Sequence, residues 1–235
     1  MSKTNCDFSL IIPCYNEEAS ITKLIEACLE IDNCEEKIQF IFVNNGSTDL
    51  TGVLLLEKSK SLRNCKVLQY TTNLGYGGGI LFGLKNAEAP LLAWTHADLQ
   101  TPVDDVLKAF MLYQAADPKP LLIKGARVER PWVDILFSRL MSFCSLIFNG
   151  NYLTEINAQP KLFSRNFFES IEEDCPSDFG LDLFVVLRAK KKGPIVEFPV
   201  RFFKRKSGIA KGGGGGLLQK IKLSLRTLKY MRRLR

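Results

Sequence analysis

The chain contains one histidine, and it stands beside an aspartate and a glutamine where an apolar run ends. The stretch from Leu91 to Pro102 reads LLAWTHADLQTP, which spaces His96, Asp98 and Gln100 two residues apart. Imidazole, carboxylate and amide groups all form hydrogen bonds, and a buried strand needs none of them at its end. The pattern therefore indicates a ligand site, although for His96 the alternative is a polar side chain satisfied at a strand end.

Three further polar clusters follow apolar runs earlier in the chain. They read CYNEE, NNGSTD and TTNLGYGGG, at residues 14–18, 44–49 and 71–79. In a parallel α/β sheet, ligands gather at the carboxyl ends of the strands, in the crevice where the strand order switches. Four clusters at four strand ends therefore predict one ligand site along one edge of the sheet.

Alternating strand and helix patterns predict the sheet that would hold these clusters. Apolar β-branched runs predict strands, apolar residues at helical spacing predict helices, and Asn16 can cap the first helix. The predicted strands lie at Phe8–Pro13, 38–43, 65–70 and 90–95, and the predicted helices at 16–31, Val53–Lys60 and Ile80–Ala87. This order predicts an α/β fold with a Rossmann-like, doubly wound, mostly parallel sheet and helices on both faces.

The second half of the chain has a less regular pattern. The predicted strands lie at 121–127 and 194–204, the helices at Val133–Phe148 and 179–193, and a strand or turn at 156–163. Five consecutive glycines then end the globular pattern, because they support no regular element. We expect one domain over residues 1–206, a glycine-rich linker over 207–216 and a basic amphipathic helix over 217–235.

The net charge of +7 is concentrated at the C-terminus. Residues 204–235 hold eleven lysines and arginines and no acidic residue, so the first 203 residues carry a net charge of −4. A basic tail on an acidic domain argues against a nucleic-acid-binding core. The odd number of scattered cysteines is typical of reduced thiols in the cytoplasm, and no signal peptide or transmembrane run is evident.

The four clusters, taken in order, resemble the family 2 glycosyltransferases of GT-A fold. The matching segments read LIIPCYNEEASI, VNNGSTDLT, NLGYGGGILFGL and HADLQTP, and a looser likeness continues to about residue 205. The branch that fits best contains the dolichyl- and polyprenyl-phosphate sugar synthases. The resemblance implies an inverting, metal-dependent transfer of a hexose from a nucleotide sugar, UDP- or GDP-hexose, to an acceptor.

The resemblance also implies which residues bind the nucleotide. The positions that match the family's nucleotide-binding segments are Pro13, Tyr15, Asn16, Glu17, Asn44, Asn45, Asn73, Gly75 and Ala97. Asn44 and Asn45 stand where the family usually has two aspartates, and an amide can donate where a carboxylate only accepts. For Asn16 and Glu17 the alternative is helix capping, for Gly75 a plain helix-entry turn, and we expect Asp49 to cap the following helix.

The family's Asp-x-Asp motif, which holds a divalent metal against the donor diphosphate, corresponds to the H-A-D segment that ends at Asp98. The resemblance implies Mg²⁺ or Mn²⁺ bound by Asp98, by Gln100 and, where the ion accepts imidazole, by His96. The implied catalytic residues are Asp98 through this metal, Arg127 as a cation for the leaving diphosphate, and Asp182 in the same crevice. For Asp182 the alternative is an acid on a helix surface.

A polyprenyl phosphate is the expected acceptor, because its phosphate is already an anion and needs no general base. The residues expected to contact the sugar or the acceptor are Asn157, Gln159, Arg201 and Arg205. One alternative is a glycan acceptor, with a carboxylate base among residues 172–178. The other is a protein that binds nucleotide sugars without turnover.

The C-terminal segment LLQKIKLSLRTLKYMRRLR combines an apolar helical face, which includes Leu225 and Leu228, with an adjoining basic arc. Such a helix suits the surface of an anionic membrane, whereas the alternative is a helix that packs on its own domain. We expect a cytoplasmic protein in peripheral contact with the inner face of an anionic membrane, and no nucleic-acid partner.

Overall fold

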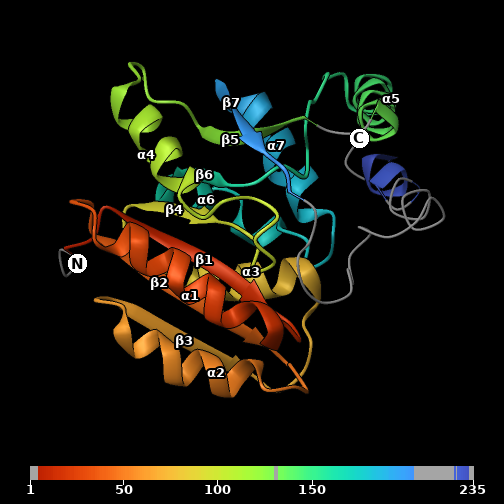
Figure 1. Ribbon diagram of the computed structural model, residues 1–235. Helices are drawn as coiled ribbons and strands as arrows, with labels where there is room; N and C mark the ends of the chain where they lie inside the picture. Colours follow the sequence, from red (N-terminus) through yellow and green to blue (C-terminus); the bar gives the residue numbers. More distant parts are fainter. Residues whose placement is uncertain (1–4, 130–131, 204–224, 226, 233–235) are drawn as a thin grey trace.

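A computed structural model describes residues 5–129, 132–203, 225 and 227–232 of the chain. The expected linker over 207–216 and Arg205 lie outside the described residues, as does most of the expected tail helix. The described residues form a seven-stranded sheet with helices on both faces (Figure 1). The predicted α/β fold class is confirmed.

The sheet has the strand order β3-β2-β1-β4-β6-β5-β7. Its strands are β1 (Phe8–Cys14), β2 (Ile38–Asn45), β3 (Cys65–Tyr70), β4 (Leu91–Trp94), β5 (Leu122–Val128), β6 (Lys161–Ser164) and β7 (Ile195–Arg201). Among these strands β6 alone is antiparallel to its neighbours, β4 and β5. Because β2 and β3 lie on one side of β1 and β4 on the other, the strand order switches between β1 and β4.

Helices cover both faces of this sheet (Figure 1). They are α1 (Glu18–Asp32), α2 (Thr51–Lys58), α3 (Gly75–Lys85), α4 (Asp105–Ala115), α5 (Trp132–Asn149), α6 (Arg165–Glu169) and α7 (Leu181–Lys192), with short 3-10 turns at Ser59–Ser61 and Glu172–Asp174. Buried residues of α1, α2 and α4 pack on one face of the sheet, and those of α3, α6 and α7 pack on the other.

Alternation along β1 divides the core into two layers. Phe8, Leu10 and Ile12 pack toward α1, α2 and α4, whereas Ile11 packs toward α3 and α7. A parallel strand that is covered on both faces must be apolar at consecutive positions. This requirement explains why an apolar run, interrupted only by the buried Ser9, predicted β1 correctly.

Helix α3 begins five residues earlier than the predicted start at Ile80, because hydrogen bonds from other segments support its glycines. Gly75 N donates to Asn73 Oδ1 at 2.7 Å, and Gly78 N donates to Ser177 O at 2.7 Å. These bonds override the low helix propensity of glycine. The sequence pattern also failed to predict α4, whose Phe110 ring lies 5.2 Å from the Phe8 ring.

The described part of the C-terminal tail packs on the domain. Met231 is fully buried, and Leu228 and Tyr230 contact the apolar cluster beneath α3, α6 and α7. Asn149 Nδ2 of α5 donates to Met231 O at 3.0 Å. Leu225, which was expected on the same apolar face as Leu228, is exposed. For these residues the alternative of a tail packed on its own domain is correct.

Candidate functional site

The three polar residues that follow β4 lie at the switch point of the sheet. They are His96, Asp98 and Gln100. Thr95 N donates to Ile11 O of β1 at 3.1 Å, which holds this segment beside the end of β1. The three polar side chains are partly exposed, whereas Thr95 and Ala97 between them are buried. Asp98 is therefore presented at the edge of the sheet and is not enclosed in the apolar core.

The segment that carries Asp98 is held in place on two sides. Gln100 N donates to Asp98 Oδ1 at 3.1 Å, and Leu99 between them has a left-handed backbone with φ of 56°. Gln100 Nε2 donates to Phe203 O at 3.1 Å, and Phe203 N donates to Gln100 O at 2.8 Å. The exit of β7 thus anchors the loop after β4. Of the Gln100 amide, only Oε1 has the chemistry of a metal ligand.

A hydrogen-bond chain fixes the orientation of His96. Tyr76 Oη donates to Asp182 Oδ2 at 2.7 Å and lies 3.1 Å from His96 Nε2. Burial and the neighbouring Asp182 carboxylate raise the pKa of Tyr76 well above its usual range, so the hydroxyl keeps its proton. Because that proton points to Asp182, His96 Nε2 must be the donor to Tyr76. The neutral imidazole then has its lone pair on Nδ1, which makes no hydrogen bond to any residue that the structure describes.

Asp182 is the buried centre of this chain. It lies in the first turn of α7, it is 2% exposed, and it forms an ion pair with Lys161, which is fully buried. Gln159 Nε2 donates to Asp182 Oδ1 at 3.1 Å and to Tyr76 Oη at 3.3 Å. Burial lowers the pKa of Lys161 to about 8, and the Asp182 carboxylate opposes that shift. The alternative of a surface acid at position 182 is wrong.

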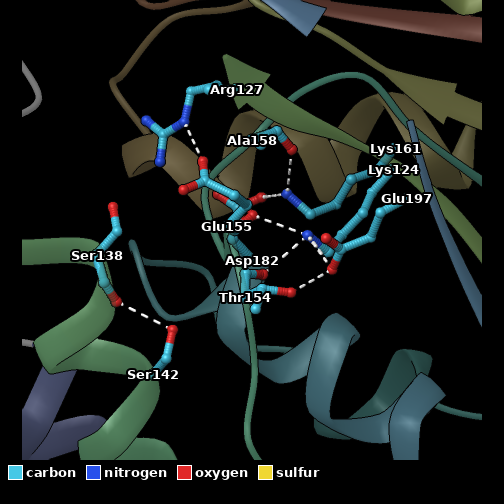
Figure 2. A network of polar contacts seen from close by, with 10 residues as sticks. All are labelled: Lys124, Arg127, Ser138, Ser142, Thr154, Glu155, Ala158, Lys161, Asp182 and Glu197. Carbon is cyan, nitrogen blue, oxygen red and sulfur yellow. Dashed lines mark hydrogen bonds and ion pairs between the residues drawn. The ribbon is translucent and has the colours of Figure 1, made fainter. Parts of the chain in front are cut away.

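A second buried lysine supports the loop that precedes β6 (Figure 2). Lys124 Nζ donates to Thr154 O at 2.8 Å and to Glu155 O at 3.1 Å, and it lies 3.0 Å from Glu197 Oε1. Burial lowers the pKa of Lys124, while Glu197 opposes the shift. These contacts fix the backbone that carries Glu155, whose φ of 42° is left-handed.

Glu155 in turn positions Arg127. Arg127 Nε donates to Glu155 Oε2 at 2.8 Å (Figure 2). The guanidinium lies 5.4 Å from the Phe202 ring. Trp94, Lys161 and Lys124 are in register across β4, β6 and β5. Arg127 therefore projects from the same edge of the sheet as His96, about two strand spacings or 10 Å away.

The asparagines at the end of β2 are engaged within the protein. Asn44 Oδ1 accepts from Ser47 N at 3.2 Å, and Asn44 Nδ2 donates to Gln69 Oε1 at 2.6 Å. Asn45 Oδ1 accepts from Leu74 N, and Asn45 Nδ2 donates to Gly75 O, both at 2.9 Å. A carboxylate could make only the accepting half of each pair. The two amides, which depart from the family's Asp-Asp pattern, thus donate and accept the hydrogen bonds that hold the loops beside β2.

The loop after β1 is joined to the loop after β2 by reciprocal capping bonds. Thr48 N donates to Asn16 Oδ1 at 2.8 Å, and Glu17 N donates to Thr51 Oγ1 at 2.7 Å. Asp49 Oδ1 accepts at 3.0 Å from the backbone N of Thr51, the first residue of α2, although the N-cap position itself is Leu50. The prediction that Asn16 caps its own helix is wrong, because its side chain spans to the neighbouring loop.

The remaining nucleotide-side positions surround these loops. Pro13, Tyr15 and Glu17 are partly buried, and Asn73 and Gly75 are exposed. A Cβ at Gly77 would lie 2.6 Å from Asp178 O, so this glycine makes room for the protein's own backbone. The roles of these residues in nucleotide binding stay predictions.

The positions expected to meet the sugar or the acceptor are not brought together as one cluster. Gln159 is 2% exposed, Asn157 is partly exposed, and Arg201 is exposed at the end of β7, 3.7 Å from Glu129 Oε2. Glu172 and Asp174, two candidate bases of the glycan alternative, form ion pairs with Lys85 and Arg188.

The site could share a metal ion with a bound diphosphate, but it does not form a complete metal cage. Within the described parts of the chain, no group of three or more His, Cys, Asp or Glu side chains could hold an ion. Asp98 offers carboxylate oxygens and His96 offers Nδ1 at one strand end, and phosphate oxygens of a substrate could complete a ligand set. The carboxylate suits Mg²⁺ or Mn²⁺, whereas the imidazole nitrogen suits only an ion that accepts imidazole.

Sequence reasoning missed the residues that hold the site from beneath. Tyr76 stands in the TTNLGYGGG cluster, but only Asn73 and Gly75 of that cluster were predicted to matter. Glu155, Lys161 and Glu197 stand in segments whose sequence indicates only a loop or a strand. The one available signal was Lys161, a charged residue at the start of an apolar run.

The fold and this site can now be compared with known proteins. Residues 9–169 match the family described as Glycosyl transferase family 2. The chain is 25% identical over 206 residues to dolichyl-phosphate beta-glucosyltransferase ALG5D of Trichomonas vaginalis, covering 78% of this chain and 62% of that one. It is 33% identical over 132 residues to undecaprenyl-phosphate 4-deoxy-4-formamido-L-arabinose transferase of Pseudomonas aeruginosa. This match covers 53% of this chain and 37% of that one. The chain thus spans less than two thirds of the length of these relatives.

Solved structures share the fold at low sequence identity. Glucosyl-3-phosphoglycerate synthase of Mycobacterium tuberculosis, in complex with Mn²⁺, UDP and glucosyl-3-phosphoglycerate, superposes with a TM-score of 0.73 at 15% identity, covering 97% of this chain and 79% of that one. A mannosyltransferase of Pyrobaculum calidifontis, in complex with GDP-Man and Mn²⁺, superposes with a TM-score of 0.62 at 17% sequence identity. The match covers 99% of this chain and 70% of that one. The likeness shows the GT-A fold. Within the part of the chain that the structure describes, no helix is long and apolar enough to cross a bilayer.

Replacement of Asn45 by aspartate should weaken the junction between β2 and α3. A carboxylate cannot donate to Gly75 O, so we expect a loss of about 1–3 kcal/mol in the free energy of unfolding, measured by urea denaturation. Asn73→Asp is the matched control, because Asn73 Oδ1 only accepts, from Gly75 N and from Asn45 Nδ2. Equal stability of the two variants would contradict the assigned bonds.

The tautomer of His96 can be read directly, because it is the only histidine in the chain. In the neutral imidazole we expect the proton on Nε2, visible in the ¹⁵N chemical shifts of the ring. Tyr76→Phe should shift the neutral ring toward a mixture of tautomers, whereas Tyr70→Phe, at an exposed tyrosine, should not. A wild-type ring protonated on Nδ1 would refute the hydrogen-bond chain.

Removal of the Lys161 cation should leave Asp182 buried without its partner. We expect Lys161→Met to lose about 3–5 kcal/mol of unfolding free energy at pH 7, measured by denaturant unfolding. Lys23→Met, on the exposed side of α1, is the control and should be nearly neutral.

The same pair predicts the pH dependence of that difference. The pKa of Lys161 is about 8 in the folded protein against an ordinary 10.5. Between these values the unfolded chain binds more protons, so the unfolding free energy rises with pH. The stability difference between wild type and Lys161→Met should therefore grow from pH 8 to pH 10, and a difference that shrinks would overturn the assignment.

Proposed function

This chain belongs to glycosyl transferase family 2, and we propose that it transfers a hexose from UDP- or GDP-hexose to a polyprenyl phosphate. The proposal includes inversion at the anomeric carbon and dependence on Mg²⁺ or Mn²⁺. Relatives named as dolichyl-phosphate and undecaprenyl-phosphate sugar transferases support the acceptor class. Structural neighbours solved with UDP or GDP-Man and Mn²⁺ support the donor class and the metal.

One observation carries this proposal. The carboxylate of Asp98 stands partly exposed at the switch point of the sheet, where β4 ends beside β1, with an oriented imidazole two residues before it. This is the place where an open α/β sheet binds ligands, and the side chains there fit a metal-bridged diphosphate. The nucleoside would lie over the joined loops that follow β1 and β2, against Tyr15, Glu17 and Asn44.

The leaving diphosphate would be stabilised by fixed positive charge. A divalent metal, when bound by Asp98, Gln100 Oε1 and His96 Nδ1, neutralises charge that develops on the diphosphate. Arg127 is already oriented by Glu155 at the same sheet edge. A preoriented guanidinium needs no reorganisation during the reaction and contributes more to a transition state than a mobile one.

The acceptor would react without a general base. A phosphate oxygen attacks the anomeric carbon, the bond from that carbon to the diphosphate oxygen breaks, and the electron pair leaves with the nucleoside diphosphate. The acceptor oxygen is already anionic, so no proton is transferred. The ion pairs of Glu172 and Asp174, and the burial of Asp182 against Lys161, favour this reaction over one that needs a carboxylate base.

A lipid acceptor would place the enzyme at the cytoplasmic surface of a membrane. Within this proposal Arg201 and Arg205, at and just beyond the end of β7, would meet the acceptor phosphate, and Asn157 would contact the sugar. Asp182 and Gln159 would act as positioning residues, because both are buried beneath Tyr76 and His96.

Replacement of Asp98 by alanine should abolish transfer while leaving the fold intact, because the side chain lies outside the core. We expect a loss of at least roughly 100-fold in turnover, measured with labelled UDP- and GDP-hexoses, polyprenyl phosphate and Mn²⁺. Asp104→Ala, an exposed acid at the start of α4, is the control and should retain activity.

Three results would change the assignment. Unchanged turnover in the Asp98 variant would remove the metal site from this position. Transfer to a free glycan but not to polyprenyl phosphate would favour the glycan acceptor. Donor binding by calorimetry with no transfer to either acceptor would identify a non-catalytic nucleotide-sugar-binding protein.

A further inference from the structure

We propose that helix α5 (Trp132–Asn149) is a membrane-docking element that lies in the surface of an anionic bilayer. Its outward face is apolar apart from Arg139, which is exposed and follows Trp132 and Leu136 at helical spacing. Leu136, Leu140, Phe143 and Ile147 follow helical spacing and are each more than half exposed. Trp132, at the start of the helix, is 75% exposed, and Ile135 and Leu146 extend the same face.

The inward face of α5 combines a row of serines with Met141, Cys144 and Phe148, which pack on the apolar cluster beneath α3, α6 and α7. Ser138, Ser142 and Ser145 follow helical spacing, and Ser142 and Ser145 are buried against the domain. Ser142 Oγ donates to Ser138 O at 3.0 Å (Figure 2), and Ser145 Oγ has no hydrogen-bond partner among the described residues. A helix on the surface of a water-soluble domain buries its apolar residues and exposes its polar ones. Helix α5 packs apolar residues on the domain and exposes a second apolar side, and this exposed side indicates an apolar environment outside the helix.

Cations lie within and beside this apolar face. Arg139 stands within it and is exposed, and Lys229 and Arg232 are exposed on the tail helix, which contacts the end of α5. Asn149 Nδ2 donates to Met231 O at 3.0 Å, and the Arg232 guanidinium lies 5.1 Å from the Phe148 ring. Residues 217–235 contain no acidic side chain, and α5 contains only one. An apolar stripe with a basic border is the chemistry that binds anionic lipid headgroups and the acyl region beneath them.

Charge disfavours the other possible occupants of this face. A second copy packed on it through a two-fold axis near the middle of α5 would bring Arg139 toward its own equivalent. Residues 204–224 are themselves basic and contain no acidic residue, so they would add like charge to the same border. An anionic bilayer neutralises the border and buries the apolar stripe.

The position of α5 suits a lipid acceptor. The helix follows β5, the strand that carries Arg127, and Figure 1 shows it beside the C-terminal helix at one side of the domain. Ser138 and Ser142 lie on the side of α5 that faces Arg127 and Glu155 (Figure 2). This inference extends the proposed function and rests on it for the identity of the lipid substrate, but the surface of α5 carries the docking itself.

Vesicle binding tests the proposal. The full chain is mixed with phosphatidylcholine vesicles that contain or lack phosphatidylglycerol, without donor or acceptor, and the bound fraction is measured by flotation. We expect binding to the anionic vesicles, and at least about a tenfold weaker partition for Leu140→Glu/Phe143→Glu. Leu56→Glu/Met111→Glu, at exposed apolar positions of α2 and α4, is the matched control and should bind like wild type. Lys229→Gln/Arg232→Gln should lose roughly 5-fold per removed charge.

Several outcomes would overturn the docking surface. Absence of binding to anionic vesicles by the wild-type protein would exclude the docking surface. Sedimentation would then show whether Leu140→Glu/Phe143→Glu disrupts a dimer. Unchanged vesicle binding by Leu140→Glu/Phe143→Glu would exclude α5 as the contact. A large loss of thermal stability in that variant, without vesicle binding by wild type, would mean that the chain itself covers the helix.

Detergent assays separate this inference from the proposed function. Transfer to detergent-solubilised polyprenyl phosphate by a protein that does not bind vesicles would leave the function standing and refute the docking surface. Vesicle binding through α5 by a protein that transfers no sugar would support the docking surface and refute the proposed function.

Discussion

The ion pair between Lys161 and Asp182 is the interaction on which the site depends. Both side chains are removed from water, so each charge is tolerable only because the other lies beside it. The paired carboxylate then accepts the Tyr76 proton, and Tyr76 in turn accepts from His96. The buried Lys161–Asp182 ion pair thereby sets which nitrogen of the His96 imidazole carries the proton.

The same arrangement explains how this chain departs from its family without losing a binding edge. Asn44 and Asn45 replace carboxylates, and each uses both halves of its amide to join neighbouring loops. Histidine replaces a carboxylate at position 96, where a tyrosine hydroxyl is available to orient it. These changes remove negative charge from the sheet edge, and Asp98 remains there as the carboxylate with the chemistry to hold a divalent ion against phosphates.

Helix α5 differs from the sheet in which side chains it exposes to solvent. The central strands bury apolar residues on both faces, whereas α5 packs Met141, Cys144 and Phe148 on the core and also exposes leucine and phenylalanine on its outer side. An apolar phase against that outer side would bury the exposed residues. The catalytic edge and the apolar surface are thus joined by one short connection after β5.

The sequence by itself determined the strands, most helices and the polar clusters at the strand ends, because period and local composition report how one element meets its surroundings. It placed His96, Asp98 and Gln100 directly after a strand, and the structure shows that strand ending at the switch point of the sheet. It misplaced the start of α3, whose glycines are supported by Asn73 and Ser177 from other segments. Only the tertiary structure decided that Lys161 neutralises Asp182. It also decided that Tyr76 orients His96, 20 residues away in the sequence, and donates to Asp182, 106 residues away. It further decided that an apolar side of α5 faces outward. Spacing along a chain encodes neighbours within an element, whereas these contacts arise where separate elements pack together.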